Sequence, residues 1–152
     1  KVTEWQAAIG LSQLKKIDSF LKKRQKNFET LFCGLKDSKA EYFFLLPQWE
    51  KEAQPSWFGF PLTIKDGVSF NRSKLINFIE NHGIATRVLF AGNITRQPAF
   101  VYDKPLHRIA SDLVNTDKVL KDTFWLGLWP GLGEDQMQYI IRTLKDFISL
   151  NA

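Results

Sequence analysis

Residues 3–35 read TEWQAAIGLSQLKKIDSFLKKRQKNFETLFCGL, and this stretch decides the fold. Its apolar residues recur mostly at steps of three or four, which predicts an amphipathic helix. Thr3 and Gln6 have the spacing of a capping box, so Thr3 is the expected N-cap. At ~1.5 Å per residue the whole stretch would be about 50 Å long. A compact chain of this size is only about 40 Å across.

A straight helix would therefore extend beyond the rest of the molecule. We expect a bend near Asp18, where a second N-cap can form. We also expect the first turns, with Trp5, Ala8 and Ile9, to pack on a large domain of the same protein or on a second subunit. The chain starts with Lys1 rather than Met and enters the helical pattern at once, so we expect a piece of a longer protein.

Downstream of this helix, strands and helices alternate. Patterns of aromatic and β-branched residues predict strands at 42–46, 57–64, 84–90 and 123–128. Helical patterns cover 72–81, 106–113, 115–122 and 134–150. Pro61 argues for an edge position or a bulge, and Asp66-Gly67 allows a hairpin into 68–70. The expected class is α/β (α+β): a long helix at 1–36, then a two-layer domain at 37–152 with a small, mostly antiparallel sheet covered by helices.

The chain has 152 residues and a net charge of +5, and that charge lies entirely in residues 1–36. A basic helix of this kind suits either nucleic acid or plain solvent. No aromatic residues interleave its lysines, which favours a solvated face over a nucleic-acid module. No apolar run approaches the roughly 18 residues of a membrane span. Cys33 is the only cysteine, so an internal disulfide is excluded, and a reducing cytoplasm is expected. We expect Cys33 to lie in the core.

No complete catalytic or metal site is visible in the sequence. His82 falls at the expected end of helix 72–81 and His107 in a loop, without ligand spacing around either. Arg87, Asn93 and Arg96 form the one concentrated polar segment. Two guanidiniums with an amide between them at a strand end suit a phosphate or carboxylate. The alternative, left open by the residues alone, is that both arginines pair with local acids such as Asp103.

Four stretches resemble a known family: 1–14 (KVTEWQAAIGLSQL), 56–61 (SWFGFP), 86–100 (TRVLFAGNITRQPAF), and 123–127 (TFWLG) leading to 130–132 (PGL). The chain resembles the C-terminal part of the DegT-type sugar aminotransferases over nearly its whole length. The 86–100 segment is similar to the CDP-4-keto-6-deoxyglucose 3-dehydrase branch. The resemblance implies the small domain of a fold-type-I aminotransferase, which a long helix links to a large cofactor domain.

That resemblance also implies what the parent protein contains. It implies pyridoxal or pyridoxamine phosphate, a 2Fe–2S cluster in the dehydrase branch, a nucleotide-sugar substrate, a homodimer and a reductase partner in the cytoplasm. The cofactor lysine or its His replacement, the acid at the pyridine nitrogen and the cluster cysteines all precede Lys1 in the family, so no catalytic residue is expected here. Cys33 does not match a cluster ligand. An ordinary sugar aminotransferase is the alternative enzyme, and the upstream Lys or His distinguishes the two.

For this chain the resemblance implies substrate contacts only. Arg87, Asn93 and Arg96 are expected to hold the phosphates or sugar of the nucleotide-sugar. Ser56, Trp57 and Phe58 are expected at the rim of the site, and Lys1 near the cofactor phosphate. Alone, the chain is expected to bind no cofactor and to show no turnover.

Overall fold

A computed structural model describes residues 2–104 and 106–151 and shows an arch-shaped α+β domain. Its helices are α1 (Glu4–Leu14), α2 (Ile17–Lys36), α3 (Ala40–Phe43), α4 (Arg72–Asn81), α5 (Pro98–Val101), α6 (Val114–Asp122) and α7 (Glu134–Asn151), with a 3-10 turn η1 at Ile94–Arg96. The strands are β1 (Phe44–Leu45), β2 (Gly59–Ile64), β3 (Thr86–Val88) and β4 (Thr123–Gly127). They pair antiparallel in the order β1-β2-β4-β3. The expected fold class is confirmed.

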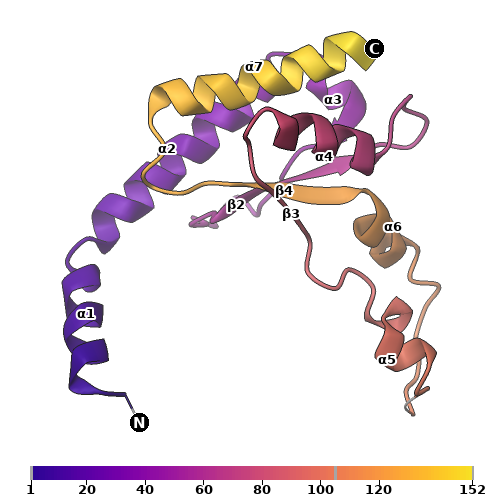
Figure 1. Ribbon diagram of the computed structural model, residues 1–152, viewed down its shortest axis with the longest axis horizontal. Coiled ribbons are helices and arrows are strands. Elements are labelled where there is room, and N and C mark those ends of the chain that lie inside the picture. Colours follow the sequence, from indigo (N-terminus) through magenta and orange to yellow (C-terminus); the bar gives the residue numbers. More distant parts are fainter. Residues whose placement is uncertain (1, 105, 152) are drawn as a thin grey trace.

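Helices α2, α3, α4 and α7 lie on one side of the sheet, and the core lies between them and the strands (Figure 1). Alternate side chains of β2 and β4, including Phe60, Leu62, Phe124 and Leu126, point into this core and are buried. The predicted apolar face of α7 is also buried: Met137, Ile140, Ile141, Leu144, Phe147 and Ile148. Burial of this single face therefore fixes which side of the sheet the helices occupy.

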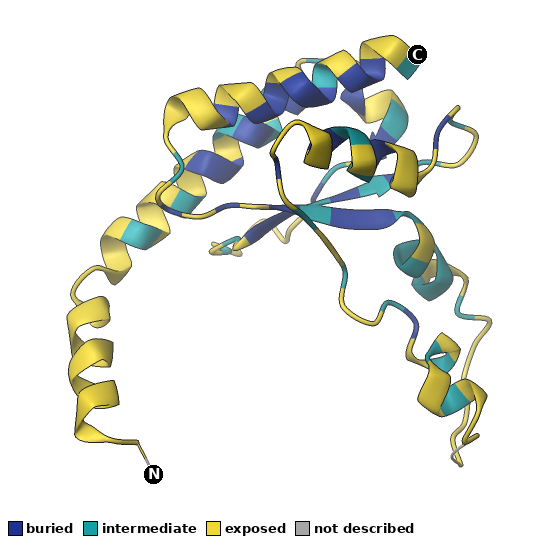
Figure 2. Cartoon of the chain, viewed as in Figure 1, coloured by how far each residue is buried: buried dark blue, intermediate teal, exposed yellow. Residues whose placement is uncertain are grey.

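The first helix is broken, and its early part stands away from the body. The capping box forms, with Thr3 N donating to Gln6 Oε1 at 2.9 Å and Gln6 N to Thr3 Oγ1 at 3.4 Å. The break falls at Lys15 and Lys16, before the expected position, and Lys16 caps α2 without a side-chain hydrogen bond. The expected N-cap near Asp18 is thus wrong. Every residue of α1 is exposed (Figure 2), and Trp5 is 83% accessible.

Several local predictions were wrong for physical reasons. Cys33 is exposed because the buried stripe of α2 runs through Phe28, Leu31 and Leu35, and a residue two positions from Leu31 points the other way. Pro61, by contrast, does lie at an edge position, as predicted. β2 has strands on both sides, but β1 pairs only with its last two residues, so Pro61 has a strand neighbour on one side only.

The remaining differences concern short elements. The predicted strand at 42–46 is half helix, since α3 extends to Phe43. The turn at Asp66-Gly67 leads into α4 rather than into a hairpin, and β3 is shorter than predicted. The described residues of 106–113 are irregular rather than helical, and the exposed side chains there find no core that would stabilise a short helix. α6 begins after Leu113, whose left-handed backbone (φ 57°) replaces the expected side-chain cap. Among described residues no helix is both long and apolar enough to cross a membrane.

Candidate ligand-binding face of the sheet

The face of the sheet opposite the core is the candidate site. Pro61, Trp125 and Arg87 stand opposite one another on three neighbouring strands. Since side chains alternate along a strand, all three point away from the core side that holds Phe60 and Phe124. No described helix lies over the centre of this face (Figure 1). We call it the open face.

Two adjoining hollows mark the open face. The first, about 260 Å³, is lined by Arg24, Phe58, Gly59, Arg87, Trp125, Gly127, Leu128 and Trp129. The second, about 330 Å³, is lined by Pro55, Ser56, Trp57, Phe58, Gly59, Pro61, Leu89, Phe90 and Trp125. The Phe58 ring meets Trp125 edge-on at 4.2 Å. A Cβ on Gly59 would lie 2.1 Å from Trp125 Cε3, so only glycine lets the indole lie flat on β2.

The structure brings four of the six predicted substrate residues to this face. Arg87 is exposed in the first hollow and makes no ion pair with any described residue. Phe58 lines both hollows, and Ser56 lines the second. Trp57 also lines the second, but its ring stacks on the core residue Phe28 at 4.9 Å, so it serves packing as well.

Asn93 and Arg96 lie elsewhere, in the loop that follows β3. Asn93 is buried at 1% exposure, and its Nδ2 donates to Asp117 Oδ1 at 2.6 Å. Its Oδ1 accepts from the backbone N of Thr95 at 3.0 Å and from the hydroxyl of the same residue at 2.7 Å. Arg96 donates to both oxygens of Asp117, at 3.3 and 3.0 Å. The local acid that pairs with Arg96 is therefore Asp117, not Asp103.

This network ties the loop to α6. The hydrogen bond from Arg96, followed by that from Asn93, lowers the pKa of Asp117, and the same carboxylate raises the pKa of Arg96. Gly92, with φ +60°, packs directly on Leu120 of α6, which turns the loop inward. Asn93 is therefore not displayed beside Arg87 as the sequence suggested. It shapes the loop instead.

The other candidates of the sequence lie away from the open face. His82 ends α4, and its Nδ1 lies 2.8 Å from the carbonyl of Phe78, which is the expected helix-end role. The ring of His107 contacts Phe100 edge-on at 5.2 Å. Lys1, expected near a cofactor phosphate, lies outside the described residues.

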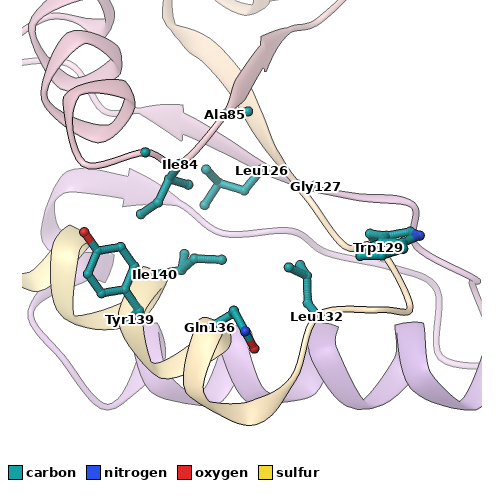
Figure 3. A pocket seen from close by; sticks show the side chains of 10 residues that line it. Ile84, Ala85, Leu126, Gly127, Trp129, Leu132, Gln136, Tyr139 and Ile140 are labelled. Carbon is teal, nitrogen blue, oxygen red and sulfur yellow. The ribbon is translucent and has the colours of Figure 1, made fainter.

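A further cavity of about 300 Å³ opens on the helical side, between α7 and the segment before β3 (Figure 3). Its walls are mostly apolar. Besides the Trp129 indole, its polar side chains are Tyr139, which donates to the His82 carbonyl, and Gln136, which accepts from Gly133 N. It offers no charged or nucleophilic group to a ligand and is a poor candidate for a polar substrate.

Arg24 was not predicted as a site residue, because it belongs to the basic helix at 1–36 whose charged face was expected to be solvated. Arg24 stands one turn before Phe28 on α2 and is half-buried, whereas Lys22, Lys23 and Lys26 are exposed. The i, i+4 relation to Phe28 was the available signal, because it places Arg24 on the face of α2 that packs toward the sheet.

The open face alone does not fit pyridoxal phosphate. The cofactor needs a phosphate cradle, an acid at its ring nitrogen and an amine or imidazole at its reacting carbon. The residues that line the two hollows include no Lys, His, Asp or Glu. No described group of three or more His, Cys, Asp or Glu residues is placed to hold a metal ion.

The chain is 40% identical over 99% of its length to the lipopolysaccharide biosynthesis protein RfbH of Salmonella typhimurium, and 42% identical over 100% to the dTDP-4-dehydro-2,6-dideoxy-D-glucose 3-dehydratase of Saccharopolyspora spinosa. It spans about a third of those relatives, 34% and 32% of their lengths.

A solved structure, the Escherichia coli GDP-4-keto-6-deoxy-D-mannose-3-dehydratase with bound hydrated PLP, superposes with a TM-score of 0.79 and 27% identity. The superposition covers 92% of this chain and 34% of that one. The family match itself extends over residues 1–145. The chain belongs to the DegT/DnrJ/EryC1/StrS aminotransferase family.

Proposed function

We propose that this chain is the C-terminal domain of a nucleotide-sugar 3-dehydrase that uses pyridoxal or pyridoxamine phosphate. The favoured substrate is CDP-4-keto-6-deoxyglucose, on the route to the dideoxysugars of lipopolysaccharide O-antigen. The observation that carries the proposal is the similarity, over the whole chain, to one relative named for lipopolysaccharide biosynthesis and another named as a 3-dehydratase. The resemblance of residues 86–100 to the dehydrase branch agrees with it.

The part we assign to this chain is one wall of the substrate site. Arg87 supplies a permanent positive charge beside the rings of Phe58 and Trp125. Such a combination suits a nucleotide-sugar, which joins flat and apolar surfaces to a doubly charged diphosphate. Asn93 and Arg96 hold the loop that follows β3 through Asp117.

The rest of the site belongs, in this proposal, to the part of the longer protein that precedes Lys1. The cofactor and a 2Fe–2S cluster would be held there, and bound cofactor would supply the electron sink for removal of the sugar hydroxyl. The exposed apolar residues of α1, Trp5 and Ile9 among them, would pack on that large domain or on the second subunit of a homodimer. A separate reductase would deliver the electrons, and all partners would be cytoplasmic.

The product of the longer polypeptide tests the proposal. That polypeptide would be incubated with pyridoxamine phosphate, CDP-4-keto-6-deoxyglucose and a reductase, and the sugar analysed by mass spectrometry and NMR. Replacement of the 3-hydroxyl by hydrogen is the expected outcome. Formation of an amino sugar with an amino-acid donor would replace the proposal by the aminotransferase alternative.

A paired substitution tests the wall itself. Arg87→Gln should raise KM for the nucleotide-sugar by about tenfold or more, as expected for loss of a charge-assisted hydrogen bond. Arg142→Gln, which removes the same charge from an exposed position of α7, is the control and should leave KM unchanged. Equal effects of the two would show that Arg87 acts only through the net charge.

The isolated 152-residue chain provides two further checks. We propose that it shows no cofactor absorbance and no turnover. The nucleic-acid alternative requires binding to DNA or RNA that weakens steeply with salt. Absence of binding at low salt would remove it.

A further inference from the structure

Two hydrogen-bond donors at the open face are buried without a partner. They are Nε of Arg24 and Nε1 of Trp125, and among the described residues these are the only buried side-chain polar atoms without one. Buried donors are almost always paired in folded proteins, because an unpaired donor loses its bonds to water and gains nothing in return. Both residues line the first hollow, together with Arg87.

The charged side chains that line this hollow are all positive. Arg24 and Arg87 both carry guanidiniums, which stay protonated at any physiological pH. No carboxylate is among the residues that line the hollow, and neither arginine forms an ion pair with a described residue. The hollow therefore suits an anion with several acceptor oxygens.

Hydrogen bonds from α2 hold a neighbouring segment beside Arg24. Asn27, three residues further along α2, is buried and donates to the carbonyls of Trp129 at 3.1 Å and Leu132 at 3.5 Å. These bonds tie the segment after β4 to α2. They hold the backbone of Trp129, a residue that lines the same hollow as Arg24.

We propose that Arg24, Arg87 and the indole N–H of Trp125 together form a diphosphate subsite, with Phe58 and Trp129 flanking the groups attached to the diphosphate. This inference rests on the proposed function and deepens it, since it assigns the charged part of the substrate to named atoms. Arg24 and Trp125 become positioning and affinity residues for the nucleotide. They take no part in bond breaking.

The test measures CDP binding to the longer polypeptide at equilibrium, by calorimetry, so that it does not depend on turnover. Arg24→Gln should weaken CDP binding by about tenfold or more. Lys23→Gln removes the same charge from the exposed neighbour on α2 and should change the dissociation constant less than about twofold. Trp125→Phe keeps a ring on Gly59 but removes the N–H, and should weaken binding by about three- to tenfold.

Thermal unfolding of each variant separates lost contacts from lost folding. A folded Arg24→Gln variant that binds CDP like the parent, or that loses no more affinity than Lys23→Gln, overturns the subsite. Failure of the proposed function looks different, because an aminotransferase product with intact Arg24 dependence would remove the 3-dehydrase and leave the subsite standing. A 3-dehydrase product combined with CDP binding that does not depend on Arg24 would remove the subsite and leave the proposed function standing.

Discussion

Asn93→Ala removes the side chain at the centre of the loop that follows β3. Its amide makes three hydrogen bonds, one to Asp117 and two to Thr95, and is almost completely buried. Alanine at this position leaves the backbone N–H of Thr95 without its side-chain acceptor. It also frees Asp117 from one of the two groups that hold its carboxylate.

The size of the expected destabilisation follows from these contacts. Three hydrogen bonds of about 0.5 to 1.5 kcal/mol each give a loss of about 2 to 4 kcal/mol in the free energy of unfolding. With a urea m-value near 2 kcal/mol per molar, the midpoint of urea unfolding should fall by about 1 to 2 M. Asn115→Ala is the control, since this exposed residue of α6 makes no assigned side-chain hydrogen bond, and it should cost less than about 0.5 kcal/mol.

Urea unfolding followed by tryptophan fluorescence and by far-UV circular dichroism measures both variants. If Asn93→Ala lowers the midpoint no more than Asn115→Ala does, the loop is not held by this network. Asn93 would then have no structural role in this loop, and a role in substrate binding would again be open to it.

Two further predictions concern the open face and its supporting loop. Gly59→Ala should displace the Trp125 ring, lower the free energy of unfolding by about 1 to 3 kcal/mol and shift the tryptophan emission. Gly127→Ala is the control, because its Cβ meets nothing within 4 Å, and it should have none of these effects. An unchanged emission spectrum for Gly59→Ala would contradict the packing of Trp125 on Gly59. The lowered pKa of Asp117 predicts that its pairing with Arg96 stabilises the loop fully above the ordinary aspartate pKa. That stabilisation should be lost as the pH falls through and below the ordinary aspartate pKa. An NMR titration of the loop amides would detect the loss, and Asp117→Asn should abolish this pH dependence.

The long periodic elements were predictable from the sequence. α4 matches its predicted bounds because Asn71 accepts from Lys74 N as the expected N-cap and Gly83, at φ +74°, ends the helix. α7 carries a continuous apolar stripe that has only one way to be buried. These elements are decided by local contacts and by their own period, so a single sequence contains the information.

The predictions that failed concern features that depend on contacts between residues distant in the sequence. β3 is short because only Thr86–Val88 pair with β4. This pairing depends on the position of β4 in the sheet and not on the sequence of the β3 segment. Arg96 pairs with an acid twenty-one residues away, which spacing alone does not single out. Arg24 resembled its exposed lysine neighbours until the packing of α2 on the sheet was known.

The proposed site for the nucleotide-sugar is the open face. Its most direct test is hydrogen exchange on the longer polypeptide, measured with and without CDP. We predict slower exchange in 56–61, 86–90 and 123–125, and no change around Gln136 and Tyr139 in the helical-side cavity. Protection confined to that cavity, with the open face unchanged, would show that the nucleotide does not bind at the open face.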